Sequence, residues 1–201
     1  MIEILYAIDK AVLLFLNQTI ANPLGDFLWP IITDYDKFLA VRILLLGAWL
    51  WLLIKGGTKG RTVALLLIPM LVVSDKLNSE VLKDLFDRAR PCHGTGQDHA
   101  VTGLRLLVNC GSGKSFPSSH AVNNFAVATL FSSFYPKYRY AFYAWAGLVA
   151  ISRPVVGVHY PSDALGGALV GVGVAFLSLR SWEWTRKRFV EWRQDRRKVA
   201  G

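Results

Sequence analysis

Charged residues are scarce in this sequence: 18% of its 201 residues are Asp, Glu, Lys or Arg, whereas 53% are hydrophobic. A chain this poor in charge does not show the pattern of a soluble domain, so the membrane class has to be tested first. Internal repeats, low-complexity tracts and a soluble linker are also missing, and the length allows one domain. We therefore expect a single membrane-embedded domain over residues 1–201.

Two further absences limit the chemistry. No clean small-residue cleavage site follows the first apolar stretch, which disfavours a secretory signal. No cluster of carboxylates is found that would hold Mg²⁺, so we expect neither a metal nor another cofactor.

Long apolar stretches, in contrast, are abundant. A helix needs roughly 20 mostly apolar residues to cross a hydrocarbon core of about 30 Å. Five stretches approach that length, at 38–54, 62–82, 121–134, 140–151 and 160–179. They predict an all-α, polytopic membrane helix bundle of about five transmembrane helices, with residues 37–180 as its core.

The N-terminal segment 1–36 begins with a different pattern. Glu3, Lys10 and Asn17 recur every seven residues and share one helical face, whereas the opposite face is apolar. Asp9, together with Lys10, interrupts the apolar run. We expect an interfacial amphipathic helix here, and the alternative is an irregular sixth span.

Basic residues gather in alternate connections. Lys55, Lys59 and Arg61 lie between the first two expected spans, and Lys137 and Arg139 lie between the third and fourth. Eight more Lys or Arg residues follow the fifth span. By the positive-inside rule these connections are cytoplasmic, and the remaining connections are extracytoplasmic.

The tail, residues 181–201, alternates basic and aromatic side chains. Aromatics and cations directly after a span form an ordinary interfacial anchor, which we favour over nucleic-acid binding. We therefore expect a multi-pass protein of the inner (plasma) membrane with a cytoplasmic C-terminus.

Unusual polar residues occur where the expected spans reach the extracytoplasmic side. Lys83 and Arg90 stand at the end of the second span. If the helix continues through both, they are two turns apart and face one direction, roughly 10 Å from each other. Such a pair suits an anion, and the alternative is two snorkelling interfacial cations.

Pro117, Ser118, Ser119 and His120 open the third span. Free backbone N–H groups and the positive end of the helix dipole favour a phosphate oxygen there. Helix capping explains either serine equally well. It does not explain His120, because a histidine side chain ordinarily titrates near physiological pH and such a residue could donate a proton to a leaving group.

His159 and Asp163 are four residues apart at the start of the fifth span. A carboxylate that accepts from Nδ1–H fixes the tautomer and leaves Nε2 free to attack, and the alternative is simple helix capping. Arg153 lies six residues before His159, and its planar fork suits two phosphoryl oxygens.

Together, the segments 83–91, 117–120 and 152–163 match K-x6-RP, PSGH and SR-x5-H-x3-D in order and spacing. Over about residues 60–180 the chain resembles the type 2 phosphatidic acid phosphatase superfamily. One departure is that Ser119 stands where the family usually has Gly. The added side chain either narrows the phosphate pocket or supplies another hydroxyl.

The resemblance implies that His159 attacks phosphorus, oriented by Asp163, and forms a phosphohistidine. It implies that His120 protonates the departing oxygen and then activates water. The residues implied to hold the phosphate oxygens, without a metal, are Lys83, Arg90, Arg153, Ser118 and Ser119.

The substrate implied by the resemblance is a lipid phosphate or diphosphate. We favour undecaprenyl diphosphate or a related polyprenyl diphosphate. The alternatives are phosphatidylglycerol phosphate, phosphatidic acid and a lipid A phosphate. A lipid phosphotransferase and, from another class, a noncatalytic scaffold or lipid transporter also stay open. The oligomeric state is open too, since a G-x-x-x-G at Gly167 and Gly171 fits dimerisation and internal packing alike.

Cys92 and Cys110 are the only cysteines, and both fall in the connection between the second and third spans. On an extracytoplasmic side we expect a disulfide, which would close a loop of about 19 residues and contribute roughly 3 kcal/mol. The alternatives are two free thiols, or a zinc site with His93 and His99, whose spacing fits no standard zinc motif.

Overall fold

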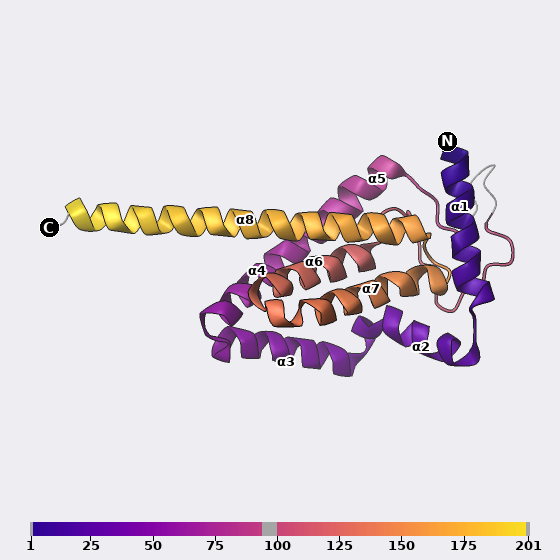
Figure 1. The fold of residues 1–201 in the computed structure, drawn as a ribbon, viewed down its shortest axis with the longest axis horizontal. Coiled ribbons are helices and arrows are strands. Elements are labelled where there is room, and N and C mark those ends of the chain that lie inside the picture. The colour runs from indigo at the N-terminus through magenta and orange to yellow at the C-terminus, as the bar shows by residue number, and fades with distance from the viewer. Residues whose placement is uncertain (1, 94–99, 200–201) are drawn as a thin grey trace.

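The computed structural model of the protein describes residues 2–93 and 100–199, and all regular elements in these ranges are helical. Figure 1 shows the main helices side by side in a bundle, with α8 projecting far beyond it. The predicted all-α membrane helix bundle is confirmed. Its main helices are α3 (Leu39–Lys55), α4 (Gly57–Lys76), α6 (Ser119–Phe134), α7 (Arg139–Val155) and α8 (Pro161–Val199).

Among the described residues, two helices are long and apolar enough to cross a membrane alone, Gly57–Phe86 and Pro161–Arg197. The first of these joins α4 to the short α5 (Lys83–Phe86) through a π-helical segment. The helices α3, α6 and α7 have 17, 16 and 17 residues. At 1.5 Å per residue they are about 24–26 Å long, slightly less than the hydrocarbon thickness. Each expected span therefore coincides with a helix, although three of the helices are short.

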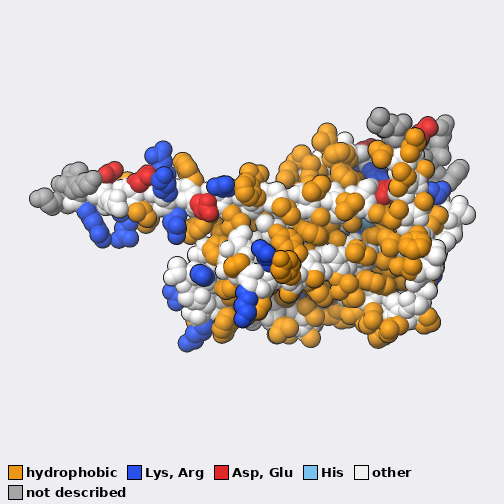
Figure 2. All heavy atoms as spheres, in the orientation of Figure 1, with side chains coloured by type: hydrophobic (Ala, Val, Ile, Leu, Met, Phe, Trp, Pro, Cys, Tyr) orange, Lys and Arg blue, Asp and Glu red, His pale blue; other side chains and the backbone are white. Residues whose placement is uncertain are grey.

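The basic connections lie at one end of the bundle. The turn from α3 to α4 and the turn from α6 to α7 are at the end toward which α8 projects, and the connections before α6 and α8 are at the opposite end (Figure 1). Hydrophobic side chains cover the bundle, whereas Lys and Arg side chains gather at the end with the turns and along the projecting helix (Figure 2). A bundle that crosses a bilayer commonly shows such an excess of basic residues in the connections at one end.

Close packing of α6 against α8 brings two chain segments of the site together. A Cβ atom at Gly167 would lie 2.7 Å from the Ser118 carbonyl oxygen, and one at Gly171 would lie 2.2 Å from the Val122 carbonyl oxygen. These two glycines therefore let the backbones of α6 and α8 approach within the monomer, which accounts for the G-x-x-x-G spacing.

We expect Gly171→Ala to lower the free energy of unfolding by about 2–3 kcal/mol, because the new methyl group would overlap a backbone atom that cannot move aside. Gly173→Ala is the matched control, since Gly173 is exposed and a methyl group there would have nothing within 4 Å of it. Thermal unfolding in detergent measures both. Equal midpoints for the two variants would contradict the packing role.

The N-terminal helices lie across the end of the bundle where α8 begins (Figure 1). They are α1 (Ile2–Leu14), which continues in a π-helical turn to Thr19, and α2 (Pro23–Thr33), and together they are bent by 118°. The apolar side of α1 is exposed, with Ile4 and Leu5 more than half accessible. Its residues Asp9, Leu13 and Asn17, spaced by four, are buried. The buried side of this N-terminal segment therefore carries polar residues as well as Leu13, and most of its apolar residues face outward.

Candidate active site

His159 lies in the connection between α7 and α8 and is 2% exposed. The connection turns at Gly157, whose φ is +86°, and a Cβ atom there would lie 2.4 Å from the Arg105 carbonyl oxygen. Asn17 from the N-terminal segment donates to the carbonyl oxygens of Arg105 and Val155, at 2.8 and 2.7 Å. The backbone on both sides of His159 is thus held by tight turns and by a distant segment.

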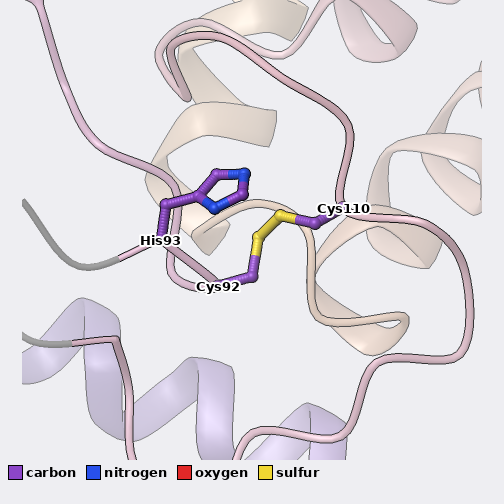
Figure 3. Close-up of side chains that lie close together, drawn as sticks. All are labelled: Cys92, His93 and Cys110. Atoms are coloured by element: carbon purple, nitrogen blue, oxygen red, sulfur yellow. A yellow bond between two sulfur atoms is a disulfide. The ribbon is translucent and has the colours of Figure 1, made fainter.

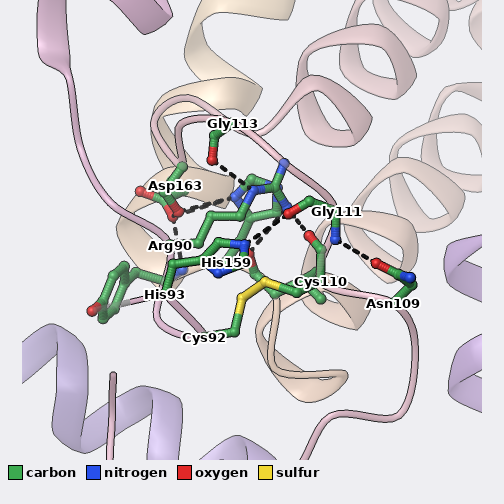
Figure 4. Close-up of a disulfide and its surroundings, with 12 residues drawn as sticks. Arg90, Cys92, His93, Asn109, Cys110, Gly111, Gly113, His159 and Asp163 are labelled. Atoms are coloured by element: carbon green, nitrogen blue, oxygen red, sulfur yellow. Dashed lines mark hydrogen bonds and ion pairs between the residues drawn. A yellow bond between two sulfur atoms is a disulfide. The ribbon is translucent and has the colours of Figure 1, made fainter. Parts of the chain in front are cut away.

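Asp163, in the first turn of α8, faces the imidazole of His159 (Figure 4). The Nδ1 of His159 is 3.4 Å from Asp163 Oδ2 and 3.3 Å from the Ser115 hydroxyl, which itself donates to Oδ2. The Tyr160 backbone N–H also donates to Oδ2, at 2.8 Å. Because this carboxylate is fully buried and bonded on several sides, it has one orientation, aimed at Nδ1.

Burial lowers the pKa of His159 to about 4, although the nearby Asp163 carboxylate raises it. The imidazole is therefore neutral at neutral pH. With Nδ1 directed at a carboxylate, a neutral ring carries its free electron pair on Nε2.

Arg90 binds backbone oxygens of the loops around His159 (Figure 4). Its guanidinium donates to the carbonyls of Cys110, Gly113 and Val158 at 3.0, 3.3 and 3.4 Å. Burial lowers the pKa of Arg90, and the charge of Asp163 opposes that shift. Arg90 is thus tied into the wall of the site.

Lys83 and Arg90 do not share a helical face, and this expectation was wrong. The helix α5 ends at Phe86, and Asp87 adopts the left-handed conformation with φ +43°. Asp tolerates that conformation better than most residues. Pro91 also restricts Arg90, the residue before it, to backbone angles outside the helical region. Arg90 and Arg153 are nevertheless both near enough to Lys83 to act on it electrostatically.

His120 is the second residue of α6, two residues after Ser118, whose backbone contacts α8. The Ser118 backbone N–H donates to the Asp163 carbonyl oxygen at 3.1 Å and fixes that meeting point. The groups near enough to act electrostatically on His120 include His159, Arg153 and Arg90. Both histidines therefore belong to one cluster at one end of the bundle.

Arg153, near the end of α7, is 5% exposed and reaches the end of α2. Its Nη1 donates to the Thr33 hydroxyl at 2.6 Å and lies 3.8 Å from Asp34 Oδ1. Its Nε and the hydroxyl of Ser118 are buried without a hydrogen-bond partner among the described residues. Buried donors rarely stay unpaired, so these two groups require an acceptor that the described part of the chain does not supply.

Ser119, which replaces the usual Gly of the resembling family, has a partner of its own. Its hydroxyl oxygen accepts from the Asn78 side-chain amide at 2.7 Å, in the π-helical segment after α4. The added side chain therefore links α6 to the helix that carries Lys83.

Three residues that touch the Asp163 network were missed in the sequence: Arg88, Ser115 and Asp9. Arg88 donates to Asp163 Oδ1 at 2.8 Å and to Asp9 Oδ2 at 2.6 Å. The available signals were a third cation between Lys83 and Arg90, and an acidic residue within an apolar run. Neither of these sequence features shows which distant group Arg88 or Asp9 contacts in the folded protein.

Cys92 and Cys110 are joined in a disulfide, and the His93 ring lies beside it (Figure 3). The Nε2 of His93 is 2.8 Å from the Gly111 carbonyl oxygen. These three residues form the one group in the described ranges that could hold a metal ion, but both sulfurs are committed to the disulfide. His99, which the zinc alternative also needs, lies outside the described residues.

Comparison with known proteins identifies the family. Residues 61–187 match the PAP2 superfamily. The chain belongs to this superfamily. The matched region contains Lys83, His120, His159 and Asp163, and the predicted membership is confirmed.

Several PAP2 relatives are named for their substrates. The chain is 34% identical to the lipid A 1-phosphatase of Rhizobium johnstonii over 107 residues, or 53% of this chain and 43% of that protein. It is 28% identical to the lipid A 4'-phosphatase of Bacteroides thetaiotaomicron over 177 residues, or 85% of this chain and 75% of that protein. The match thus spans less than half the length of the Rhizobium relative.

The fold is also similar to a solved structure. The crystal structure of a transmembrane PAP2 type phosphatidylglycerolphosphate phosphatase from Bacillus subtilis superimposes with a TM-score of 0.67 at 25% identity. The superposition covers 92% of this chain and 89% of that one. The family assignment therefore extends to the arrangement of nearly the whole chain, including helices before residue 61.

Proposed function

We propose that this PAP2 protein is a lipid phosphatase that works without a metal and passes the phosphoryl group through His159. The observation that carries the proposal is the neutral, buried His159 with its Nδ1 aimed at Asp163, in a cluster that includes Arg153 and Ser118. The Arg153 Nε and the Ser118 hydroxyl lack partners among the described residues, and phosphoryl oxygens would supply the acceptors.

The reaction has two halves. First, Nε2 of His159 attacks phosphorus, the bond from phosphorus to the leaving oxygen breaks, and His120 gives that oxygen its proton. His120 then takes a proton from water, and the hydroxide displaces the phosphoryl group from Nε2, which releases inorganic phosphate and restores the neutral ring. Lys83, Arg90 and Arg153 supply the positive charge that stabilises the phosphoryl oxygens in both transition states.

A groove beside the site supports a lipid substrate. It has a volume of about 830 Å³ and lies between α3, α4, α6 and α7. Most of its wall is apolar, including Val41, Leu71 and Trp145, and it also reaches Tyr35 and Asn124. The amide of Asn124 donates to the His120 carbonyl oxygen at 2.9 Å, so the groove adjoins the catalytic helix. A hydrocarbon chain in this groove would place its phosphate near His120.

We infer the orientation from the distribution of basic residues. The bundle end with the α3–α4 and α6–α7 turns, and the projecting part of α8, would be cytoplasmic. The site would then open outside an inner (plasma) membrane, where the Cys92–Cys110 disulfide is chemically stable.

We also propose which lipid headgroup the protein prefers. A polyprenyl diphosphate such as undecaprenyl diphosphate stays our prediction, with phosphatidylglycerol phosphate and phosphatidic acid as alternatives. A lipid A phosphate is the second candidate, because five of the relatives are named lipid A phosphatases. Transfer to a second lipid instead of water would pass through the same phosphohistidine, and labelled acceptor lipid separates the two outcomes.

We expect the purified full-length protein to release phosphate from at least one of these lipids at an unchanged rate when EDTA is present, because Lys83, Arg90 and Arg153 supply the charge that a metal would otherwise provide. Phosphate release is measured for each lipid in mixed micelles, with and without chelator. Activity that disappears with EDTA and returns with added Mg²⁺ or Zn²⁺ would contradict the metal-free mechanism.

A further inference from the structure

The helix α1 contributes a buried carboxylate to the neighbourhood of the site. Asp9 is 8% exposed, and its Oδ1 accepts from the Ser162 backbone N–H at 2.9 Å. Its Oδ2 accepts from the Ser162 hydroxyl and from Arg88. Asp9 therefore binds the first turn of α8, one residue before Asp163.

Arg88 connects this carboxylate to Asp163. Its Nη2 donates to Asp9 at 2.6 Å and its Nη1 donates to Asp163 at 2.8 Å. The guanidinium carbon lies 4.0 Å above the centre of the Tyr160 ring. Because a guanidinium is planar and offers donors in fixed directions, these contacts hold one geometry that a lysine would not reproduce.

The three linked side chains, Asp163, Arg88 and Asp9, alternate in charge. Asp163 faces His159 on one side and Arg88 on the other, and Asp9 lies beyond Arg88. Without Asp9, the Arg88 cation would cancel much of the negative potential that Asp163 presents to His159. With Asp9, the three groups together carry one net negative charge. This charge favours the positive ring that forms when Nε2 of His159 bonds to phosphorus.

The other charged or titratable groups around His159 come from three different parts of the chain. They are Arg90 in the loop after α5, Arg153 on α7 and His120 on α6. The two arginines are positive, so they oppose the basicity of His159. Asp163 is the acidic group bonded to the ring, and the Asp9–Arg88 pair decides how much of its charge the ring experiences.

We propose that Asp9 and Arg88 are positioning residues for the phosphoryl transfer: through Asp163 they set the orientation and the basicity of His159. The N-terminal helix α1 then contributes a residue, Asp9, that affects the reactivity of His159. This inference rests on the proposed role of His159 as the nucleophile.

Two single variants test the proposal, because they should change the His159 pKa in opposite directions. Asp9→Asn leaves the Arg88 charge uncompensated and should lower that pKa and reduce kcat about tenfold. Arg88→Gln leaves two neighbouring carboxylates and should raise the pKa by about one unit. The measured quantity is the ratio of variant to native kcat/KM as a function of pH, since the ionisation of the substrate cancels in that ratio.

We expect the Arg88→Gln ratio to fall toward acidic pH and the Asp9→Asn ratio to rise. The double variant Asp9→Asn/Arg88→Gln, which removes one charge of each sign, should give a nearly level ratio. Asp9→Glu keeps the charge and should also give a level ratio, with activity closer to native than that of Asp9→Asn. Glu183→Gln, in an exposed pair with Arg180 on the projecting part of α8, is the matched control.

Ratios that do not depend on pH in both single variants would overturn the proposal and leave a structural role only. If a single variant does not fold, a double variant that folds and shows a sloping ratio overturns the proposal as well. His159→Ala separates the two levels of inference. An active His159→Ala protein refutes the proposed function itself, whereas an inactive one together with level ratios refutes the Asp9–Arg88 role alone.

Discussion

His159→Ala is expected to abolish phosphate release, with a fall in kcat on the order of 10⁵-fold or more, because the variant lacks the atom that attacks phosphorus. The fold should persist, since among the described residues the imidazole is bonded only through Nδ1, and its removal leaves the contacts of Asp163 with Ser115 and Arg88 intact. Released phosphate measures activity, and size-exclusion profile and thermal midpoint measure folding.

A matched control is His93→Ala, in which a different histidine of the same region is removed. His93 is exposed, and among the described residues its ring makes one hydrogen bond, to a carbonyl of the disulfide loop, so its loss should change kcat less than about threefold. A folded His159→Ala protein that still releases phosphate would support the scaffold or transporter alternative against the enzyme.

His120→Ala is expected to lower kcat about 10³- to 10⁴-fold on a lipid phosphate, because the departing oxygen then lacks a proton donor. A phosphate ester whose leaving group needs no proton should still complete the first half-reaction in this variant, because that step no longer depends on His120. The phosphohistidine should then accumulate, since the variant also lacks the base that activates water. Mass spectrometry of a peptide containing His159, kept at alkaline pH, detects the added phosphoryl group.

The double variant His120→Ala/His159→Ala is the control, and it should carry no phosphoryl group. Phosphate on any residue other than His159, or a His120→Ala variant that turns over the activated ester as fast as the native protein, would contradict the assigned roles.

Local patterns in the sequence carried much of the functional prediction. His159 and Asp163 are four positions apart where α8 begins, so the short stretch of backbone between them already allows the two side chains to meet. The bundle was equally predictable, because the apolar stretches are long enough to require helices in a bilayer whatever their partners. The family motifs further narrowed the chemistry to phosphate.

Contacts between distant segments were not predictable in the same way. The prediction that Lys83 and Arg90 share one helix extended a local pattern, and it was wrong because the helix ends before Asp87, where the chain turns. Asp9 looked like an interruption of an apolar face, and only the packing of α1 against α8 shows that it binds Arg88 and Ser162.

What the sequence determined by itself, therefore, is the helical membrane architecture, the family and the segments that carry the site. The tertiary structure decided which side chains meet: Gly167 and Gly171 pack α8 on α6, and Arg88 links Asp163 to the N-terminal helix. The physical reason is that helix formation and hydrophobic length depend on neighbours within a few residues. The partners of a buried charge depend instead on chain segments that only folding brings together.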